Sequence, residues 1–452
     1  MIEAFPENFL FHDILRGAAP GITISELASL EGPAENPWRW GLGAETRLEI
    51  APHAQPLELR MAIRPANGQT ITIYLGDSPV SPGKIPLPPS TTPTILRYWP
   101  SLWNQIGELA PLDQRLLGVC FTELKLLHHE FANGKICPMP FTRKEIRGGG
   151  PFVPCCSPWL TPDYLGLETG AESWNGLQAQ ALRESVLNGS YRFCRRDICQ
   201  TSYFTYDELP QLSNPEGEFF LSPENLRATH RGELTLPEGP SDAVITADTR
   251  CNLACPSCRT EKITSLDAEG AARIESAKKE LQSIALRRLR IAGDGEPLFS
   301  PFLREVIQGL HQYPELKIVE LHTNGILLDE DTLRKLGPGA GKINRLFVSI
   351  DAATAETYAQ VRGGDWERLL KNLRWAASLG LDSFVLMFVY RRANFREMPL
   401  FEKLAKDVGA DSACFSPFMP WERAGGLSYK EEAVHLPGHP DHEEFLALLP
   451  QK

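Results

Sequence analysis

Three closely spaced cysteines are the residues of this 452-residue chain that point most directly to chemistry. Cys251, Cys255 and Cys258 form the pattern Cys-x3-Cys-x2-Cys. A structural zinc site normally takes four ligands, and no further cysteine or histidine follows nearby. Three thiolates suit a [4Fe–4S] cluster, which normally takes four cysteines, and would leave one iron with the open position of a reactive site. The alternatives are a zinc site or buried free thiols.

A repeating pattern of apolar runs and helix-like segments must position this cysteine loop. Six short apolar runs alternate with helix-like segments from residue 242 onward, which predicts a parallel sheet with right-handed crossovers. Six units are too few for an eight-stranded barrel, so the predicted fold class is α/β with a partial (β/α)6 TIM-like barrel. Chemistry in such folds lies at the C-terminal ends of the strands. The runs are Ala243–Ala247, Leu289–Ala292, Ile318–Leu321, Leu346–Ile350, Phe384–Val389 and Ala413–Phe415.

Further motifs fall at or beyond the predicted strand ends. They are Gly293–Pro297 (GDGEP), His322–Gly325 (HTNG), Ser349–Asp351 (SID) and Arg362–Gly364 (RGG), the last preceded by Tyr358. Together with the cysteine triplet, these motifs resemble the hallmarks of the radical S-adenosylmethionine (AdoMet, SAM) superfamily. The resemblance covers residues 243 to about 421 specifically. It implies an enzyme in which AdoMet chelates the open iron and is cleaved to a 5′-deoxyadenosyl radical that abstracts a hydrogen atom.

The resemblance also implies roles for individual residues. Cys251, Cys255 and Cys258 would hold the catalytic cluster, and Glu296 would accept a charge-assisted hydrogen bond from the methionine ammonium group. Two positions depart from the family pattern: Asp294 replaces a motif glycine, and Ser257 replaces an aromatic residue that usually packs on adenine. Leu253 or a backbone edge would then have to make the adenine contact. The remaining cofactor contacts would be Gly295, Pro297, Asn324, Ser349, Asp351, Arg362 and Asn394.

A second group of cysteines precedes the predicted barrel. The segment that contains them, with Trp174 and Arg183, resembles the SPASM/twitch extension of radical AdoMet enzymes, although that extension usually follows the barrel. The resemblance implies one auxiliary [4Fe–4S] cluster. A structural zinc ribbon is the alternative, but ribbons favour two tight Cys-x2-Cys knuckles. The implied ligands are Cys137, Cys155, Cys194 and Cys199, with Cys156 as the alternative to Cys155.

The rest of the chain has less distinctive sequence. Residues 1–133 are predicted to form an α+β domain, with a hairpin at Asn67-Gly68 and a helix over Asp113–Phe131. The predicted division continues with an auxiliary domain over 134–205, a linker over 206–240, the barrel over 241–425 and a tail over 426–452. Cys414, in the sixth apolar run, is expected in the hydrophobic core, where free cysteines are often buried; the alternative is that it points towards the pocket as a hydrogen-atom donor.

Composition excludes several classes of protein. A net charge of −11 argues against a nucleic-acid or anionic-membrane partner. The N-terminus lacks a signal-peptide pattern, and no apolar run reaches membrane length. We therefore expect a cytoplasmic protein, in which grouped cysteines bind metals more often than they form disulfides.

The first functional hypothesis is a radical AdoMet oxidoreductase or maturase that acts on a peptide or protein. The N-terminal hairpin supports it, because a strand edge could dock an extended peptide. The first alternative is a dehydrogenase or epimerase of a carbohydrate or other small molecule, and the second is a non-catalytic iron–sulfur or zinc-binding module. The enzyme would need a reductant such as flavodoxin or ferredoxin.

Overall fold

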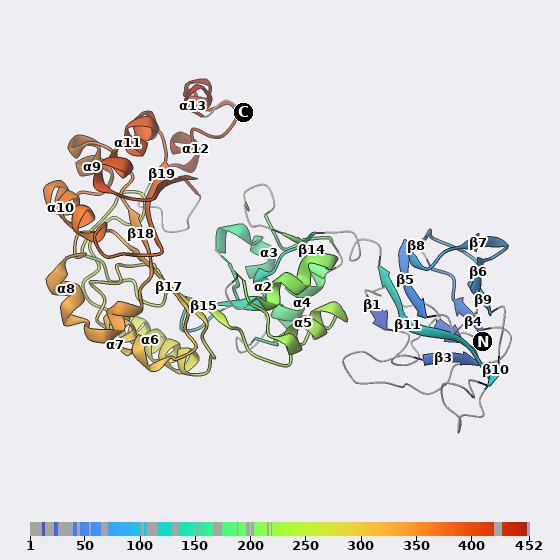
Figure 1. Ribbon diagram of the computed structural model, residues 1–452. Coiled ribbons are helices and arrows are strands. Elements are labelled where there is room, and N and C mark those ends of the chain that lie inside the picture. Colours follow the sequence, from blue (N-terminus) through green and yellow to red (C-terminus); the bar gives the residue numbers. More distant parts are fainter. Residues whose placement is uncertain are drawn as a thin grey trace.

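The structure is a computed structural model of the 452-residue chain. It describes residues 11–13, 22–25, 39–42, 46–53, 56–64, 71–100, 104–105, 116–128, 135–150, 152–155, 157–165, 174–187, 189–195, 199, 203–214, 217, 219–419 and 427–449. Figure 1 shows an N-terminal β part, a cysteine-rich middle part and a parallel-sheet part that follow one another in chain order.

A parallel sheet of seven strands forms the scaffold of the C-terminal half. Six of its strands coincide with the predicted apolar runs, which confirms the prediction of an α/β fold with a parallel sheet. The strands lie side by side in chain order, with one extra strand at the edge. They are β13 (Arg143–Ile146), β15 (Asp242–Ile245), β16 (Arg288–Ile291), β17 (Ile318–Thr323), β18 (Arg345–Ser349), β19 (Ser383–Tyr390) and β20 (Ser412–Pro417).

Amphipathic helices cover one face of this sheet (Figure 1). Alternate strand residues such as Leu289, Leu321 and Val348 are buried in the core that these helices share with the sheet, because successive strand side chains point to opposite faces. A side-chain oxygen of Asp267, Ser300, Asp329, Thr354 or Asp365 caps the N-terminus of each of five helices. The helices that cover the sheet are α6 (Ala268–Gln282), α7 (Pro301–Gly309), α8 (Glu330–Lys335), α9 (Ala355–Val361), α10 (Trp366–Ala376) and α11 (Met398–Val408). The five capped helices are α6 to α10.

The extra strand β13 comes from the cysteine-rich segment, which was predicted to be a separate domain. It pairs with β15 in parallel register, Arg143 opposite Asp242, and these two side chains form a buried ion pair at 2.6 Å. The sequence Arg-Lys-Glu-Ile lacks the apolar run by which the other strands were recognised. The division between an auxiliary domain and the barrel is therefore less sharp than predicted.

The segment 206–240 was predicted to be a linker, but it is folded against the cysteine-rich part. Leu209, Leu212, Phe219 and Leu236 are buried in one core with Cys137. The prediction was wrong because Pro and Gly end helices without preventing burial of the apolar residues between them. The elements here are β12 (Lys135–Ile136), α2 (Met139–Thr142), α3 (Pro162–Leu165), α4 (Leu177–Leu187), β14 (Phe204–Thr205), a 3₁₀ helix (Tyr206–Ser213) and α5 (Pro223–His230).

The described N-terminal residues form two antiparallel sheets rather than an α+β domain. Residues of both sheets, such as Leu59 and Leu96, share one core. The first sheet holds β1 (Phe11–Asp13), β3 (Arg39–Leu42), β5 (Leu57–Arg64), β8 (Gly83–Leu87), β10 (Asn104–Gln105) and β11 (Leu116–His128). The second holds β2 (Ile22–Ile24), β4 (Thr46–Ile50), β6 (Ile71–Leu75), β7 (Ser78–Val80) and β9 (Thr94–Pro100).

Two local predictions in this part were wrong. The segment predicted as a helix over Asp113–Phe131 contains the long strand β11, which pairs with β5. Pairing with distant strands outweighs a local helical pattern of apolar residues. The hairpin predicted at Asn67-Gly68 is also wrong: that turn lies outside the described residues, but β5 and β6 belong to different sheets.

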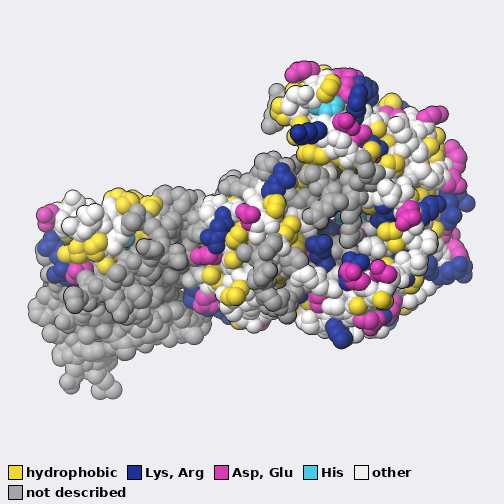
Figure 2. Space-filling view, turned by 180° about the vertical axis from the view of Figure 1, so that it is seen from behind, with side chains coloured by type: hydrophobic (Ala, Val, Ile, Leu, Met, Phe, Trp, Pro, Cys, Tyr) yellow, Lys and Arg dark blue, Asp and Glu magenta, His cyan; other side chains and the backbone are white. Residues whose placement is uncertain are grey.

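The segment predicted as a C-terminal tail packs on the parallel-sheet part. Val434 and Phe445 are buried in its core, and Arg391 forms an ion pair with Glu432 at 2.7 Å. The segment contains α12 (Tyr429–Glu432) and α13 (His442–Leu448). Figure 2 shows Lys and Arg side chains interspersed with Asp and Glu over the described surface of the parallel-sheet part, as expected for the solvent faces of amphipathic helices.

Candidate functional site

The cysteine triplet lies on the loop that follows β15. Cys251 and Cys255 are buried, whereas Cys258 is exposed. Each sulfur has at least one donor nearby: the backbone N–H of Leu253 lies 3.4 Å from Cys251 Sγ, Arg362 Nη1 lies 3.8 Å from Cys255 Sγ and Arg259 Nη2 lies 3.4 Å from Cys258 Sγ. Donors and positive charge favour the thiolate form that a metal requires. Burial nevertheless raises the pKa of the Cys251 thiol.

Glu296 is a buried carboxylate that three protein groups hold in place at the end of β16. Its Oε1 accepts hydrogen bonds from Thr323 Oγ1 at 2.6 Å and from the Leu298 N–H at 3.1 Å. Its Oε2 accepts one, from the Asn324 N–H at 2.7 Å, and so keeps capacity for another donor. Burial raises the pKa of Glu296 despite these three bonds. Arg362 opposes this shift by placing positive charge near the carboxylate.

The turn that carries Glu296 lies against the cysteine loop. A β-carbon on Gly295 would lie 2.3 Å from the carbonyl oxygen of Arg250 and 2.6 Å from that of Asp248. A glycine is therefore required at position 295, and Pro297 beside it is buried. Asp294, which departs from the family motif, is half-buried, and its carbonyl oxygen accepts a hydrogen bond from Arg259. The turn therefore accommodates a side chain at position 294, where the family motif has a glycine.

Asn324 connects Glu296 to the cysteine loop. Its side-chain amide donates to Asn252 Oδ1 at 2.8 Å and lies 4.0 Å from Cys251 Sγ. Its Oδ1 accepts the N–H of Ile326 at 3.1 Å. The predicted residues Cys251, Glu296 and Asn324 therefore converge on one place, although they come from three different strand ends.

Arg362, Asp351 and Asn394 form a second polar group beside Cys255. Arg362 Nη2 pairs with Asp351 Oδ2 at 2.7 Å, and Asp351 has a left-handed backbone with φ of 58°. Asn394 donates to the carbonyl oxygens of Asp351 at 2.8 Å and Val389 at 3.0 Å. Its side-chain amide is thus engaged with backbone, so Asn394 positions Asp351 in this structure instead of presenting a free polar group.

Three other predictions concern side chains whose surroundings are now visible. Ser349 is half-buried at the end of β18, and its hydroxyl group has no hydrogen-bond partner among the described residues. Leu253 is buried in the hydrophobic core, which leaves a backbone edge rather than this side chain for an adenine contact. Cys414 is opposite Met387 in register and lies on the other face from Ala413 and Phe415, which pack on the core. The prediction of a core position for Cys414 was therefore wrong.

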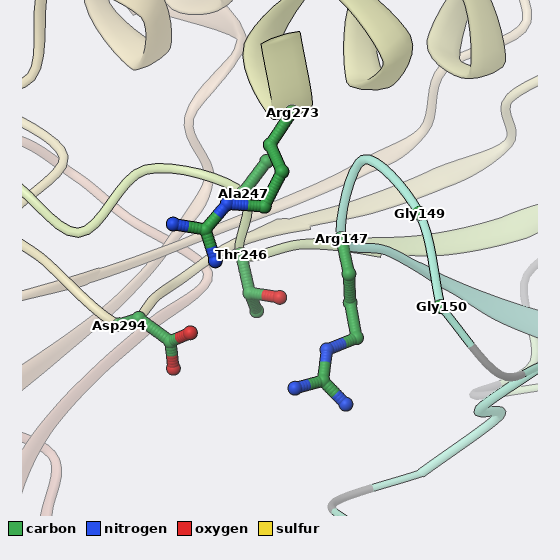
Figure 3. A pocket seen from close by; sticks show the side chains of 7 residues that line it. All are labelled: Arg147, Gly149, Gly150, Thr246, Ala247, Arg273 and Asp294. Atoms are coloured by element: carbon green, nitrogen blue, oxygen red, sulfur yellow. The ribbon is translucent and has the colours of Figure 1, made fainter. Parts of the chain in front are cut away.

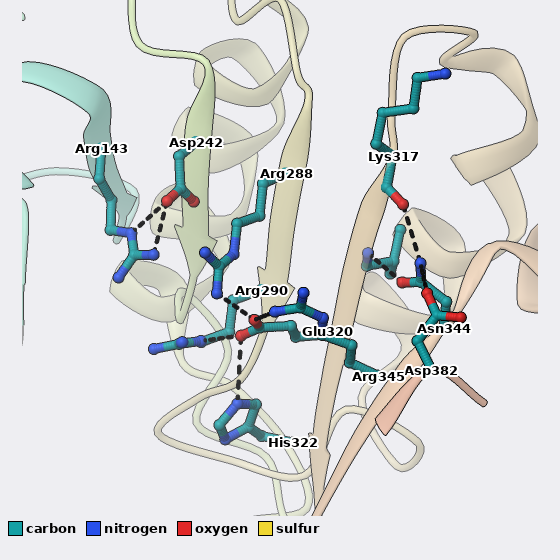
Figure 4. Close-up of polar contacts among 11 residues, drawn as sticks. Arg143, Asp242, Arg288, Arg290, Lys317, Glu320, His322, Asn344, Arg345 and Asp382 are labelled. Atoms are coloured by element: carbon teal, nitrogen blue, oxygen red, sulfur yellow. Dashed lines mark hydrogen bonds and ion pairs between the residues drawn. The ribbon is translucent and has the colours of Figure 1, made fainter. Parts of the chain in front are cut away.

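The sheet face that points away from the helices carries charge as well. Figure 4 shows Glu320 of β17 surrounded by arginines of neighbouring strands. It pairs with Arg288, with Arg290 Nε at 2.6 Å and with Arg345 Nη1 at 3.5 Å. Burial alone would raise the pKa of Glu320, but His322 and the arginines hold it far below its ordinary value. This cluster neutralises one carboxylate with three cations, so the inner face keeps a positive excess.

The second group of cysteines also converges. Cys137, Cys155, Cys194 and Cys199 all line one pocket. Cys156 lies outside the described residues. Burial raises the pKa of Cys137 strongly, and the nearby Cys194 and Cys199 raise it further. The other lining residues are mostly apolar or aromatic: Met139, Pro140, Pro154, Trp159, Leu160, Leu182, Val186, Tyr191 and Tyr203.

Sequence reasoning missed two polar residues, Glu145 and Arg147, because they lie on the unrecognised strand β13 and the loop after it. Glu145 accepts a hydrogen bond from Thr246 Oγ1 at 2.8 Å, and burial raises its pKa to about 7. Arg147 follows two residues later. The local sequence carries little signal for a strand, because Arg143, Lys144 and Glu145 are consecutive charged residues and do not alternate with apolar ones.

Both cysteine groups have the chemistry that an iron–sulfur cluster requires of its ligands. The triplet supplies three sulfurs, each with a nearby donor, and the second group supplies four sulfurs around one apolar pocket. In the described ranges, no three or more His, Cys, Asp or Glu side chains are grouped so that they could hold a metal ion. The two cysteine groups therefore match sulfur-ligated clusters in the type and number of their ligands, but the described side chains do not form a metal-binding arrangement.

Comparison with known proteins identifies the class of the parallel-sheet part. Residues 248–405 match the family model described as the Radical SAM superfamily, so this segment is a radical SAM domain. Such a domain implies a [4Fe–4S] cluster and AdoMet. The match includes the cysteine triplet, Glu296, Asn324 and Arg362, and it excludes β13 and the second cysteine group.

Two curated proteins illustrate what the chain is similar to. The chain is 33% identical over 169 residues to a probable GTP 3′,8-cyclase of Methanococcus vannielii, covering 35% of this chain and 53% of the relative. It is 34% identical over 164 residues to the AdoMet-dependent heme synthase of Methanosarcina barkeri, covering 35% of this chain and 45% of the relative. The chain thus spans about half the length of the curated relatives it matches.

Solved structures show only a distant likeness. The Streptococcus suis protein SuiB bound to the precursor peptide SuiA is 14% identical, with a TM-score of 0.33 and coverage of 57% of this chain and 54% of that chain. This level of similarity carries no information on substrate.

The prediction of a peptide or protein substrate is contradicted by the curated relatives, several of which are named for a reaction of GTP, a small molecule. The hairpin that supported the peptide hypothesis is also absent, since β5 and β6 lie in different sheets. Separately, none of the helices in the described ranges has the length and apolar character needed to traverse a bilayer.

Proposed function

We propose that this protein is a radical SAM enzyme that acts on a small molecule as an oxidoreductase, such as a dehydrogenase or epimerase of a carbohydrate or related compound. The convergence of Cys251, Glu296 and Asn324 carries the proposal. The Asn324 backbone fixes the Glu296 carboxylate, and its side chain reaches the cysteine loop. A group bound to iron at that loop would therefore lie beside a buried carboxylate that retains an unused acceptor position.

The bound cluster and AdoMet would supply a reducing electron and a 5′-deoxyadenosyl radical that removes a hydrogen atom from the substrate. Within this proposal the chain binds and orients the reactants. Cys251, Cys255 and Cys258 ligate the cluster, and Glu296 accepts a hydrogen bond from the methionine ammonium group. Arg362, close to Cys255 and paired with Asp351, adds positive charge beside the thiolates. A reductant such as flavodoxin or ferredoxin would deliver the electron.

We further propose that Cys137, Cys155, Cys194 and Cys199 hold an auxiliary [4Fe–4S] cluster. Support comes from the single pocket that these four side chains line. Four thiolates close the coordination sphere, which suits electron transfer rather than substrate ligation. Arg183 stabilises the surrounding fold: it is fully buried and donates to the carbonyl oxygens of Pro140, Trp174 and Leu234 at 2.8–2.9 Å.

Anaerobic reconstitution with iron and sulfide, followed by dithionite and AdoMet, tests both proposals. The wild-type chain should form 5′-deoxyadenosine. Cys255→Ala should abolish that product, whereas Cys194→Ala should leave it measurable. Each variant should lose about four iron atoms per chain, the content of one [4Fe–4S] cluster. Cys414→Ser, which removes a thiol outside both groups, is the matched control and should keep the full iron content.

An intact cluster that never yields 5′-deoxyadenosine would overturn the enzyme proposal. Full iron content in Cys194→Ala and in the matching Cys137→Ala would instead overturn the auxiliary cluster alone.

A further inference from the structure

A polar pocket lies where the loop after β13 meets α6 and the ends of β15 and β16 (Figure 3). It encloses about 130 Å³, which is room for several water molecules or a small polar group. Arg147 and Arg273 extend into this space from different sides; in this view Thr246 lies between them, and Asp294 lies on the side away from Arg147 (Figure 3). Two guanidinium groups and one carboxylate give the lining a net positive charge.

The arginines retain hydrogen-bonding capacity. Arg273 Nε is buried without a partner among the described residues. Arg147 Nη1 donates to Ser157 Oγ at 2.9 Å, and a guanidinium group has five N–H donors in all. An unpartnered buried donor is costly, and a bound oxyanion would satisfy it. Arginine is also the side chain whose planar fork best matches carboxylate and phosphate.

Backbone packing holds the two arginines near each other. Gly148 has φ of 77°, and a β-carbon there would lie 2.0 Å from the carbonyl oxygen of Arg273. The loop after β13 therefore rests directly on the first turns of α6. Gly149 and Gly150 follow with φ of 127° and 95°, and a β-carbon on either would meet nothing within 4 Å. The absence of side chains at these two positions leaves the rim of the pocket uncovered.

The pocket borders the proposed AdoMet site. Asp294 lies in the same turn as Glu296, and Thr246 is on the chain that leads from β15 to Cys251. Thr246 also donates to Glu145, whose pKa of about 7, raised by burial, reduces the negative charge that it places near Arg147. A ligand anchored here would extend toward the place where the radical forms.

We propose that this pocket binds the anionic group, a phosphate or a carboxylate, of the small-molecule substrate. The inference rests on the proposed function and adds a substrate class to it. It also gives the strand β13, which lies outside the matched radical SAM domain, a role in substrate selection. Asp294 would accept a hydrogen bond from a neutral donor next to the anion, such as a hydroxyl group.

Calorimetric titration of the full, reconstituted chain with inorganic phosphate and, separately, with acetate tests the proposal. One of these anions should bind the wild type. Binding of phosphate would indicate a phosphorylated substrate, and binding of acetate would indicate a carboxylate. Arg273→Gln and Arg147→Gln should each weaken that binding about tenfold or more, equivalent to about 1.4 kcal/mol. Arg273→Lys, which keeps the charge but not the fork, should give an intermediate loss. Lys279→Gln removes an exposed charge from the same helix and should change nothing.

AdoMet titration of the same variants separates the alternatives. AdoMet affinity should stay at the wild-type level in Arg273→Gln; a parallel loss would assign the pocket to AdoMet and overturn the proposal. Equal anion affinity in wild type and both glutamine variants, or binding of neither anion by the wild type, would also overturn it. If the wild type binds the anion but forms no 5′-deoxyadenosine, the proposed function fails and the anion pocket stands.

Discussion

The backbone N–H of Asn324 donates to Oε2 of Glu296 at 2.7 Å across 28 residues of sequence. The side chain of Asn324 then donates to Asn252, inside the cysteine loop. One residue thus joins three strand ends: β15 through the loop, β16 through Glu296 and β17 through itself. The carboxylate and the cysteine triplet are therefore held as one unit before any ligand binds.

Glu296→Gln should weaken AdoMet binding at least tenfold while leaving the iron content unchanged. The NH2 group of the glutamine would face another donor, either the Asn324 N–H or the Thr323 hydroxyl and Leu298 N–H groups. The substitution would also remove the negative charge that attracts an ammonium group. Leaving a buried donor unsatisfied should also lower the free energy of unfolding by about 1–3 kcal/mol. Equilibrium AdoMet binding, iron analysis and urea unfolding measure these effects.

The matched control is Glu330→Gln, an exposed carboxylate at the start of α8. Unchanged AdoMet affinity in Glu296→Gln would show that this carboxylate does not contact the cofactor.

Arg362→Gln should destabilise the chain by about 3 kcal/mol, because Asp351 would be left with a buried charge and no counterion. Asp351 also has a left-handed backbone that its contacts with Arg362, Val389 and Asn394 hold in place. The double variant with Asp351→Asn should be less destabilised than the sum of the two single variants. Additive losses in a double-mutant cycle, measured by urea unfolding, would contradict a direct ion pair.

Stability should fall as pH rises between about 4.5 and 7 because of Glu145. Burial raises the pKa of this carboxyl from 4.5 to about 7 despite Arg143 and Arg147 nearby, so the native chain holds a proton that the unfolded chain has already lost. The loss across this window should reach about 3 kcal/mol. Glu145→Gln should flatten this part of the curve in urea unfolding measured at several pH values. An identical slope in Glu145→Gln and the exposed control Glu356→Gln would show that Glu145 titrates normally.

Gly148→Ala should destabilise the protein more than Gly76→Ala. Both glycines have positive φ, 77° and 60°, but an added β-carbon meets nothing within 4 Å at position 76 and lies 2.0 Å from the Arg273 carbonyl oxygen at position 148. The backbone strain alone should cost about 1–2 kcal/mol in each case. Only Gly148→Ala should also weaken anion binding, because it displaces the loop that carries Arg147. Thermal unfolding and phosphate titration compare the two, and equal effects on both would mean that the loop does not rest on α6.

Local patterns determined much of this protein from sequence. The spacing of Cys251, Cys255 and Cys258 and the alternation of apolar runs with helices predicted the cysteine loop and six parallel strands. Both signals are short-range: a loop motif needs only neighbouring residues, and apolar periodicity directly reflects which face of an element is buried. The sequence also grouped Cys137, Cys155, Cys194 and Cys199, and these four side chains line one pocket in the structure.

Pairing between distant segments was decided only by the tertiary structure. The charged strand β13 pairs with the main sheet, where Arg143 forms an ion pair with Asp242, 99 residues away in sequence. No local sequence pattern indicates this partner. Distant pairing also decides two other features. The leucines of β11 have helical spacing, but the segment is a strand paired with β5. The sheet face on which Cys414 lies depends on the register of β20 with β19. Neighbours along the chain decide which helix or strand a residue can join. Contacts between distant segments decide which site its side chain lines. The pocket between Arg147 and Arg273 depends entirely on such distant contacts.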